Sequence, residues 1–368
     1  MKPATSLRKT PLHSLHRKLG ARMAEFGGWE MPIEYSGIIP EHLAVRTTAG
    51  LFDISHMGRI QIEGPQSLNL VQKVSSNDAS RLKDGQIHYS ALLYPEGTFV
   101  DDVLVHRLAP DRYFLCVNAS NCETDFEWIR SQNEFQATVT NASDHYAQLA
   151  LQGPRSVQVL QPLVDIDLSQ IRYYWLRMGR VQGVECLITR TGYTGEDGFE
   201  IYFGPEHSER MWDLLSESGS KHGLVPVGLG ARNTLRLEAK MALYGHEISE
   251  KITPWEADLA WIVKLDKGDF VGKQALLAQR ATGVPRKLVG FEMTGKGIGR
   301  DGYPVWLDDQ QVGFVTSGAP SPFLKKNIGL AYVPLRHATV GMELQIEVRT
   351  QRIPARIVET PFYSRNRQ

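Results

Sequence analysis

Apolar residues recur every three or four positions in several segments of the chain, which is the spacing of one helix face. In one of these segments Leu70, Val71 and Val74 follow this period. Pro40 near the start of another, and Gly50 beyond its end, are typical boundary residues of a helix. The pattern predicts helices over residues 40–46, 66–74, 123–132, 155–163, 208–218 and 230–239.

Other segments are short, rich in Val, Ile, Leu and Phe, and bounded by turn residues, as strands are. Pro110 and Asp111 separate two of them, and the Gly-rich segment 191–198 joins two others into a hairpin. After about residue 280, short β-rich runs alternate with Gly and Pro turns. Strands are predicted over residues 99–107, 112–118, 146–151, 186–190 and 199–203. We therefore expect an α+β region over residues 1–280 and a small all-β domain over residues 281–368.

One predicted strand carries two adjacent carboxylates, Asp101 and Asp102, inside an otherwise apolar run. Successive side chains of a strand point to opposite faces, so Asp101 shares a face with Phe99 and Val103. Asp102 shares the other face with Leu104. The more apolar face is expected to be the inner one, which places Asp101 inward. From residue types alone, the favoured interpretation of Asp101 is structural, as a hydrogen-bond partner of a backbone N–H group or an arginine.

Two further places have a structural and a functional interpretation. Glu200 interrupts the second hairpin strand and shares a face with Tyr202. In the structural interpretation that face is solvated. In the functional one the Glu200 carboxylate accepts paired N–H bonds from a ligand such as a pterin or aminopyrimidine edge. Arg232 and Arg236 lie four residues apart and share a helix face, either as a surface paired with acids or as a site for a ligand carboxylate. Residue types alone favour the structural interpretation of both.

The composition is close to that of an average globular protein. With 368 residues, of which 42% are hydrophobic and 22% charged, the chain is long enough for two or three domains. Lysine plus arginine and aspartate plus glutamate each number 41, and a formal net charge of zero gives no support for affinity to nucleic acid or a membrane surface. Cys116, Cys122 and Cys186 lack C-x-x-C spacing. We therefore expect no disulfide scaffold, no metal site, no secretory signal, and a cytoplasmic, reducing compartment.

Common catalytic motifs find no support in the sequence. Residues 297–302 match G-x-G-x-x-G by letter, but Tyr303 and Pro304 follow and favour an extended chain, whereas a pyrophosphate-binding loop opens a helix. There is no G-x-S-x-G elbow, Walker loop or H-E-x-x-H motif. These observations argue against the common hydrolase and kinase chemistries.

Six segments, taken together, are more informative than any one of them. They are residues 41–58 (EHLAVRTTAGLFDISHMG), 100–102 (VDD), 189–201 (TRTGYTGEDGFEI), 228–239 (GLGARNTLRLEA), 243–247 (LYGHE) and 315–318 (VTSG). In this order they resemble the motifs of the T-protein family of the glycine cleavage system, aminomethyltransferases that use tetrahydrofolate. The resemblance extends roughly from residue 10 to residue 363.

The resemblance implies a fold and a reaction. The implied fold is three domains arranged like a clover leaf around a central folate cavity. Two are intertwined α+β subdomains, the second over roughly 51–144, and the third is a C-terminal β-barrel. The implied reaction transfers the one-carbon unit of an aminomethyl group, carried on the lipoyl arm of the H-protein, to tetrahydrofolate and releases ammonia. Lipoylated H-protein is thus the expected partner, and no nucleic acid, membrane or metal is expected.

The resemblance also implies roles for individual residues. Glu200 matches the family residue that holds the pterin, Arg232 matches one that binds the folate tail, and Asp101 matches the critical carboxylate close to the reacting nitrogens. We hypothesise that Asp101 stabilises a transient cationic iminium or handles its proton. Further candidates for the cavity, chosen from their positions in or near the motifs, are Asn118, Tyr193, Tyr89 and Met57.

The chain departs from the family pattern at Asn233 and Lys240, where the family usually has Asp and Gly. Three related classes compete with the transferase. A folate-binding protein of iron–sulfur cluster maintenance carries K-G-C-[FY]-x-G-Q-E, and Asp269 at the Cys position argues against it. A class in which this fold is fused to a flavin oxidase domain would need a dinucleotide fingerprint and extra length, and the sequence has neither, which argues against it. Folate-dependent demethylases of small molecules, which lack the H-protein partner, are excluded less cleanly.

Overall fold

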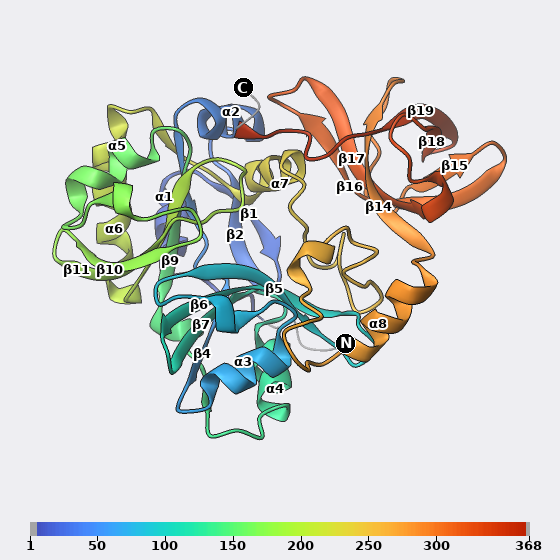
Figure 1. Ribbon diagram of the computed structural model, residues 1–368. Coiled ribbons are helices and arrows are strands. Elements are labelled where there is room, and N and C mark those ends of the chain that lie inside the picture. The colour runs from blue at the N-terminus through green and yellow to red at the C-terminus, as the bar shows by residue number, and fades with distance from the viewer. Residues whose placement is uncertain (1–5, 366–368) are drawn as a thin grey trace.

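The computed structural model describes residues 6–365, and three of its β-sheets each form a lobe of the molecule (Figure 1). A six-stranded and a five-stranded sheet belong to the α+β part of the chain, and a closed six-stranded barrel forms the C-terminal part. A hairpin of β1 (Arg22–Phe26) and β2 (Trp29–Glu34) adds a small fourth sheet. The predicted α+β class with an all-β C-terminal domain is confirmed.

The six-stranded sheet is antiparallel except at one edge, where β13 runs parallel to β3. Across the sheet its strands are β10 (Leu176–Val181), β11 (Val184–Thr189), β12 (Gly198–Phe203), β9 (Ala147–Gln152), β3 (Ala49–Asp53) and β13 (Leu224–Pro226). The helices of this lobe are α1 (His13–Lys18), α5 (Ser156–Leu160) and α6 (Ser208–Ser220). Phe199 and Ile201 of β12 pack with Trp212 of α6 in the core of this lobe. Alternation along β12 therefore sends Glu200 and Tyr202 to the opposite face of the sheet.

The five-stranded sheet is antiparallel throughout. Its strands, in order, are β5 (Ile87–Leu93), β6 (Phe99–Ala109), β7 (Arg112–Val117), β4 (Gly58–Glu63) and β8 (Thr138–Asn141). The lobe's helices α3 (Ser67–Val74) and α4 (Cys122–Ser131) contribute Leu70 and Ile129 to a core shared with Val103 and Val105 of β6. Asp101 shares this inner face of β6 and is fully buried, as the alternation predicts.

The barrel consists of β14 (Arg286–Met293), β17 (Lys326–Pro334), β16 (Gln310–Ser321), β15 (Pro304–Leu307), β18 (Glu343–Val348) and β19 (Gln351–Val358). Before it, α8 (Lys273–Thr282) lies between the barrel and the five-stranded lobe (Figure 1). Residues 297–302 connect β14 to β15 without a helix, which confirms that they are no dinucleotide fingerprint. The two remaining helices, α2 (Ile38–Thr47) and α7 (Leu229–Glu238), pack against each other between the lobes.

The predicted helices and strands are all present, with their ends displaced by two residues at most, apart from α5. That helix ends at Leu160 and the chain continues as a 3-10 turn to Leu163. The five-stranded sheet extends from residue 58 to 141, and the predicted division at residue 280 falls in the last turn of α8. No helix between residues 6 and 365 has the length and apolar content needed to cross a membrane.

Candidate active site

A cavity of about 780 Å³ lies where the three lobes meet. Asp102 of β6 and Glu200 of β12 come from the two α+β sheets, and Arg232 comes from α7. Leu288 of β14 and Leu330 of β17 close the wall on the barrel side. The volume is typical of sites for small molecules.

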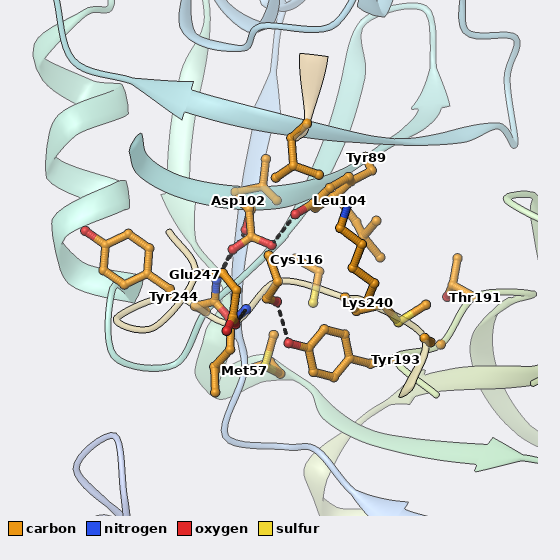
Figure 2. A pocket seen from close by; sticks show the side chains of 18 of the residues that line it. Met57, Tyr89, Asp102, Leu104, Cys116, Thr191, Tyr193, Lys240, Tyr244 and Glu247 are labelled. Carbon is orange, nitrogen blue, oxygen red and sulfur yellow. Dashed lines mark hydrogen bonds between the residues drawn. The ribbon is translucent and has the colours of Figure 1, made fainter. Parts of the chain in front are cut away.

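All the residues predicted to bind a ligand line this cavity, although they come from distant parts of the chain. They are Met57, Tyr89, Asn118, Tyr193, Glu200 and Arg232. Met57, Tyr89 and Tyr193 surround the same space in Figure 2. The fold thus brings together side chains that the sequence could only assign to separate motifs.

Of the two adjacent carboxylates of β6, Asp102 lines the cavity and Asp101 does not. The resemblance placed Asp101 beside the reacting nitrogens, but its side chain is on the face of β6 that packs under the helices, and it is absent from the wall. Its carboxylate accepts hydrogen bonds from the backbone N–H of Asn118 (3.0 Å) and from the side-chain amides of Asn118 and Asn121 (2.8 Å each). The alternation that buries Asp101 turns Asp102 toward the cavity.

Asp102 is held from two sides (Figure 2). The Tyr89 hydroxyl donates to Oδ2 at 2.7 Å, and Nδ2 of Asn118 donates to Oδ1 at 2.7 Å. Burial, and then the neighbouring charge of Asp101, raise the pKa of Asp102 to about 7, against the lowering effect of these two donors. The cavity therefore contains a carboxyl group that titrates near neutral pH.

Glu200 occupies a different part of the wall, beside Thr191. The Thr191 hydroxyl donates to Oε2 of Glu200 at 2.6 Å. Burial raises the pKa of this carboxyl, whereas the hydrogen bond from Thr191 and the charge of Arg232 oppose the shift. The solvated interpretation of this strand face is wrong, because Glu200 is only 5% exposed and the lobes cover the face.

Arg232 and Arg236 have different surroundings despite their helical spacing. The Arg232 guanidinium lies over the Tyr193 ring, 4.6 Å from its centroid, and its buried Nη1 has no hydrogen-bond partner within residues 6–365. Arg236 instead donates to Glu247 (2.6 Å) and to Ser317 of the barrel (2.7 Å). Arg236 is thus a structural tie between α7 and the barrel, and Arg232 has hydrogen-bonding capacity left for a ligand.

Four further aromatic side chains, which the sequence did not single out, line the cavity. They are Tyr173, Tyr174, Tyr244 and Trp261. The rings of Tyr89 and Trp261 lie 5.7 Å apart, centroid to centroid. Flat aromatic walls suit a flat ligand. Tyr173, Tyr174 and Trp261 lie in connecting segments outside the quoted motifs, so their only sequence signal is their aromatic character. Tyr244 lies within the motif of residues 243–247, but that motif alone does not place its ring in the cavity.

Lys240, where the family usually has Gly, adopts a left-handed backbone conformation with φ of 54°. Such a φ favours glycine, which accounts for the usual residue. The lysine lines the cavity, and its ammonium group forms an ion pair with Asp258. Asp258 forms a second ion pair with Lys287, with 3.1 Å between Nζ of Lys287 and Oδ1 of Asp258. Lys240 therefore adds a paired cation to the wall. Between residues 6 and 365, no three His, Cys, Asp or Glu side chains gather in a way that would hold a metal ion.

Comparisons with known proteins cover nearly the whole chain. Residues 12–267 match the family model described as the GCVT N-terminal domain, and residues 286–364 match the glycine cleavage T-protein C-terminal barrel domain. The aminomethyltransferase of Acidobacterium capsulatum is 57% identical over 98% of this chain and 97% of its own. That of Desulfitobacterium hafniense is 51% identical over 98% and 99%. The crystal structure of glycine cleavage system aminomethyltransferase T from Bartonella henselae superposes with a TM-score of 0.92 at 35% identity, over 97% of this chain and 98% of that one.

Proposed function

The chain belongs to the family of glycine cleavage system aminomethyltransferases, the T-proteins, and we propose that its cavity binds tetrahydrofolate as the acceptor of the one-carbon unit. The donor is an aminomethyl group carried on the lipoyl arm of an H-protein. The reaction forms methylene-tetrahydrofolate and frees ammonia and the reduced lipoyl thiol. The cavity supports this function through its size, its aromatic walls and its separate polar ends.

We assign the pterin ring to the part of the cavity beside Glu200. A buried carboxylate can accept two parallel N–H bonds from an aminopyrimidine edge, and such charge-assisted pairs are strong and directional. Thr191 holds one oxygen of Glu200 at 2.6 Å and so fixes the plane of the carboxylate. Tyr173 and Tyr174 on the same wall offer aromatic surface to the ring.

We assign the anionic tail of folate to Arg232. Its Nη1 is buried without a protein partner, and an unsatisfied buried donor is costly unless a ligand supplies the acceptor. Tyr193 supports the guanidinium through its ring face and is itself fixed by a hydrogen bond to the Ala242 carbonyl. A carboxylate ligand would satisfy the free nitrogen in a fixed direction.

Asp102 is our candidate for the acid of the reaction. A carboxyl with a pKa of about 7 is protonated in a substantial fraction of molecules at neutral pH, so it can give a proton to the departing amine. Once ionised, it stabilises the cationic one-carbon centre electrostatically. Asp101 acts behind it, because its negative charge raises the pKa of Asp102 and its hydrogen bonds hold Asn118 in place.

The arrangement of the lobes fits a clover leaf with folate at its centre. Each of the three sheets contributes to one cavity, so the ligand would contact the whole chain at once. The exposed indole of Trp261, which also lines the cavity, marks an opening through which a lipoyl arm from the H-protein would enter. The observation that carries the proposal is Asp102, with its raised pKa, on the wall that also contains Glu200 and Arg232.

The test uses purified protein, tetrahydrofolate and aminomethyl-loaded lipoylated H-protein. We expect methylene-tetrahydrofolate and ammonia in equal amounts. Asp102→Asn should bind tetrahydrofolate normally and lose roughly 100- to 10,000-fold in turnover, the usual contribution of a positioned acid. Asp101→Asn should also retain binding and lose turnover. A fully active Asp102→Asn protein would exclude this residue as the acid, and folate binding without ammonia release would point instead to a demethylase or a non-catalytic folate binder.

A further inference from the structure

A third carboxyl group, that of Asp125, lies behind the two carboxylates of β6. Asp125 is on α4, fully buried, and within hydrogen-bonding reach of Asp101. Neither of its oxygens receives a hydrogen bond from an N–H or O–H group of residues 6–365. The titratable groups that face it are Asp101 and Asp102 from β6, Cys122 from its own helix, and Tyr244 from the segment after α7.

Three neighbouring carboxyl groups, two of them fully buried, cannot all be charged without a compensating cation. No Arg, Lys or His of residues 6–365 forms an ion pair with Asp101, Asp102 or Asp125, whereas Asp78, Asp84 and Glu127 of the same lobe each have one. Burial raises the pKa of Asp101 as well, but its hydrogen bonds oppose that shift and favour its ionised form over that of Asp125. Asp101 accepts three N–H bonds, which stabilise its charged form, whereas Asp125 accepts none.

We propose that Asp125 is a neutral carboxylic acid that donates its proton in a hydrogen bond to Asp101 and thereby keeps Asp101 ionised. It is a positioning residue, because it has no contact with the cavity and acts through Asp101. The charge held on Asp101 in turn keeps the proton on Asp102 up to neutral pH. A carboxyl in an apolar site remaining neutral in order to donate a hydrogen bond is physically reasonable, and burial raises the pKa of Asp125 well above its usual range.

The part of this proposal that concerns turnover rests on the proposed aminomethyltransferase reaction, whereas the protonation of Asp125 can be measured without it. Infrared spectra of the free protein at about pH 9, where Asp102 has lost its proton, should contain the carbonyl band of a protonated carboxylic acid. The band should disappear in Asp125→Asn and persist in Asp213→Asn, a control on the exposed face of α6. A band that persists in Asp125→Asn, or is missing from the wild type, would overturn the proposal.

The second measurement is the pH dependence of kcat/KM in two variants. Asp125→Leu removes the donor, so Asp101 takes up a proton itself and no longer raises the pKa of Asp102. The alkaline limb of the profile should move down by about one pH unit, which is a tenfold loss above that limb. Asp125→Asn retains an N–H donor and should restore the wild-type limb.

A folded Asp125→Leu protein with unchanged tetrahydrofolate affinity and an unchanged profile would refute the proposal. If the wild type itself releases no ammonia, the proposed function fails instead, and the infrared result still decides the state of Asp125.

Discussion

The Tyr89 hydroxyl donates a hydrogen bond of 2.7 Å to Oδ2 of Asp102. The two side chains share the cavity face of neighbouring strands, where Tyr89 of β5 lies directly opposite Leu104 of β6 and reaches Asp102 diagonally. The bond stabilises the ionised form of the carboxylate and opposes the upward shift of its pKa by burial and by Asp101. Tyr89 therefore limits how high the proton affinity of Asp102 can rise.

Tyr89→Phe should raise the pKa of Asp102 above its value of about 7. A hydrogen bond to a charged group contributes about 1.5 kcal/mol or more, which corresponds to about one pH unit. The alkaline limb of the rate profile should therefore move to higher pH, opposite to the effect of removing the Asp101 charge. The measurement is kcat/KM across pH in Tyr89→Phe and Asp101→Asn. Shifts in the same direction in both variants would contradict this account of the site.

Sequence alternation correctly separated the two carboxylates of β6 but could not tell which one faces the ligand. The rule finds the apolar face, and Asp101 does lie on it, packed under α3 and α4. The opposite face would be solvated in an isolated sheet. Here the other lobes cover it, so the polar face of β6 lines a cavity and Asp102 becomes the accessible carboxylate. The covering depends on how the lobes pack, which local periodicity does not encode.

The same limit applies to Asp125 and Glu200. Asp125 is in the first turn of α4, where an acid is favourable for any helix, so its sequence position gave no sign of burial beside Asp101. Glu200 was correctly placed on a face with Tyr202, but its solvent exposure could not be inferred from β12 alone.

Strands as short as β13, which has three residues, carry too little pattern to be recognised.

The stability of the protein should depend on pH below about 4 through Asp53. Its buried carboxylate lies 2.9 Å from Nε2 of His16. Burial raises the pKa of Asp53, but the hydrogen bonds and charge of His16, with Thr10 and Ser55, outweigh that effect and lower the pKa to about 2 from its ordinary value of 3.8. Because the folded-state pKa is depressed, the stabilisation is complete above the unfolded-state pKa and is lost as the pH falls toward 2.

The expected loss from this group is roughly 2 kcal/mol between about pH 5 and pH 2. Urea unfolding at several pH values should therefore show a steeper acid loss in the wild type than in Asp53→Asn. Asp213→Asn, with its exposed side chain, should follow the wild type. Parallel curves for the wild type and Asp53→Asn would exclude the pair as a source of acid sensitivity.

Gly318 of β16 should tolerate no side chain. A Cβ atom at this position would lie 1.6 Å from the carbonyl oxygen of Gly299, in the loop between β14 and β15. Gly318→Ala must push the loop away from the barrel, and overpacking of this kind typically costs about 1–3 kcal/mol. Gly297→Ala, whose Cβ would meet only side chains at 3.4 Å or more, is the matched control in the same loop. Thermal unfolding that lowers the Tm equally in both variants would contradict the assignment.

Glu200→Gln tests the pterin assignment separately from the chemistry. The amide keeps the shape of the side chain but replaces one acceptor with a donor, so a paired N–H edge loses one bond and meets an unmatched N–H group. A hydrogen bond to a charged group contributes about 1.5–3 kcal/mol, so the Kd for tetrahydrofolate should rise roughly 10- to 150-fold. Calorimetric titration of Glu200→Gln and of Glu209→Gln, an exposed control on α6, measures the change directly.

Turnover at saturating folate should change much less in Glu200→Gln than in Asp102→Asn, because Glu200 is proposed to bind the ring away from the reacting atoms. If Glu200→Gln binds folate as tightly as the control, the pterin occupies another part of the cavity, and the free Nη1 of Arg232 becomes the first place to look for it.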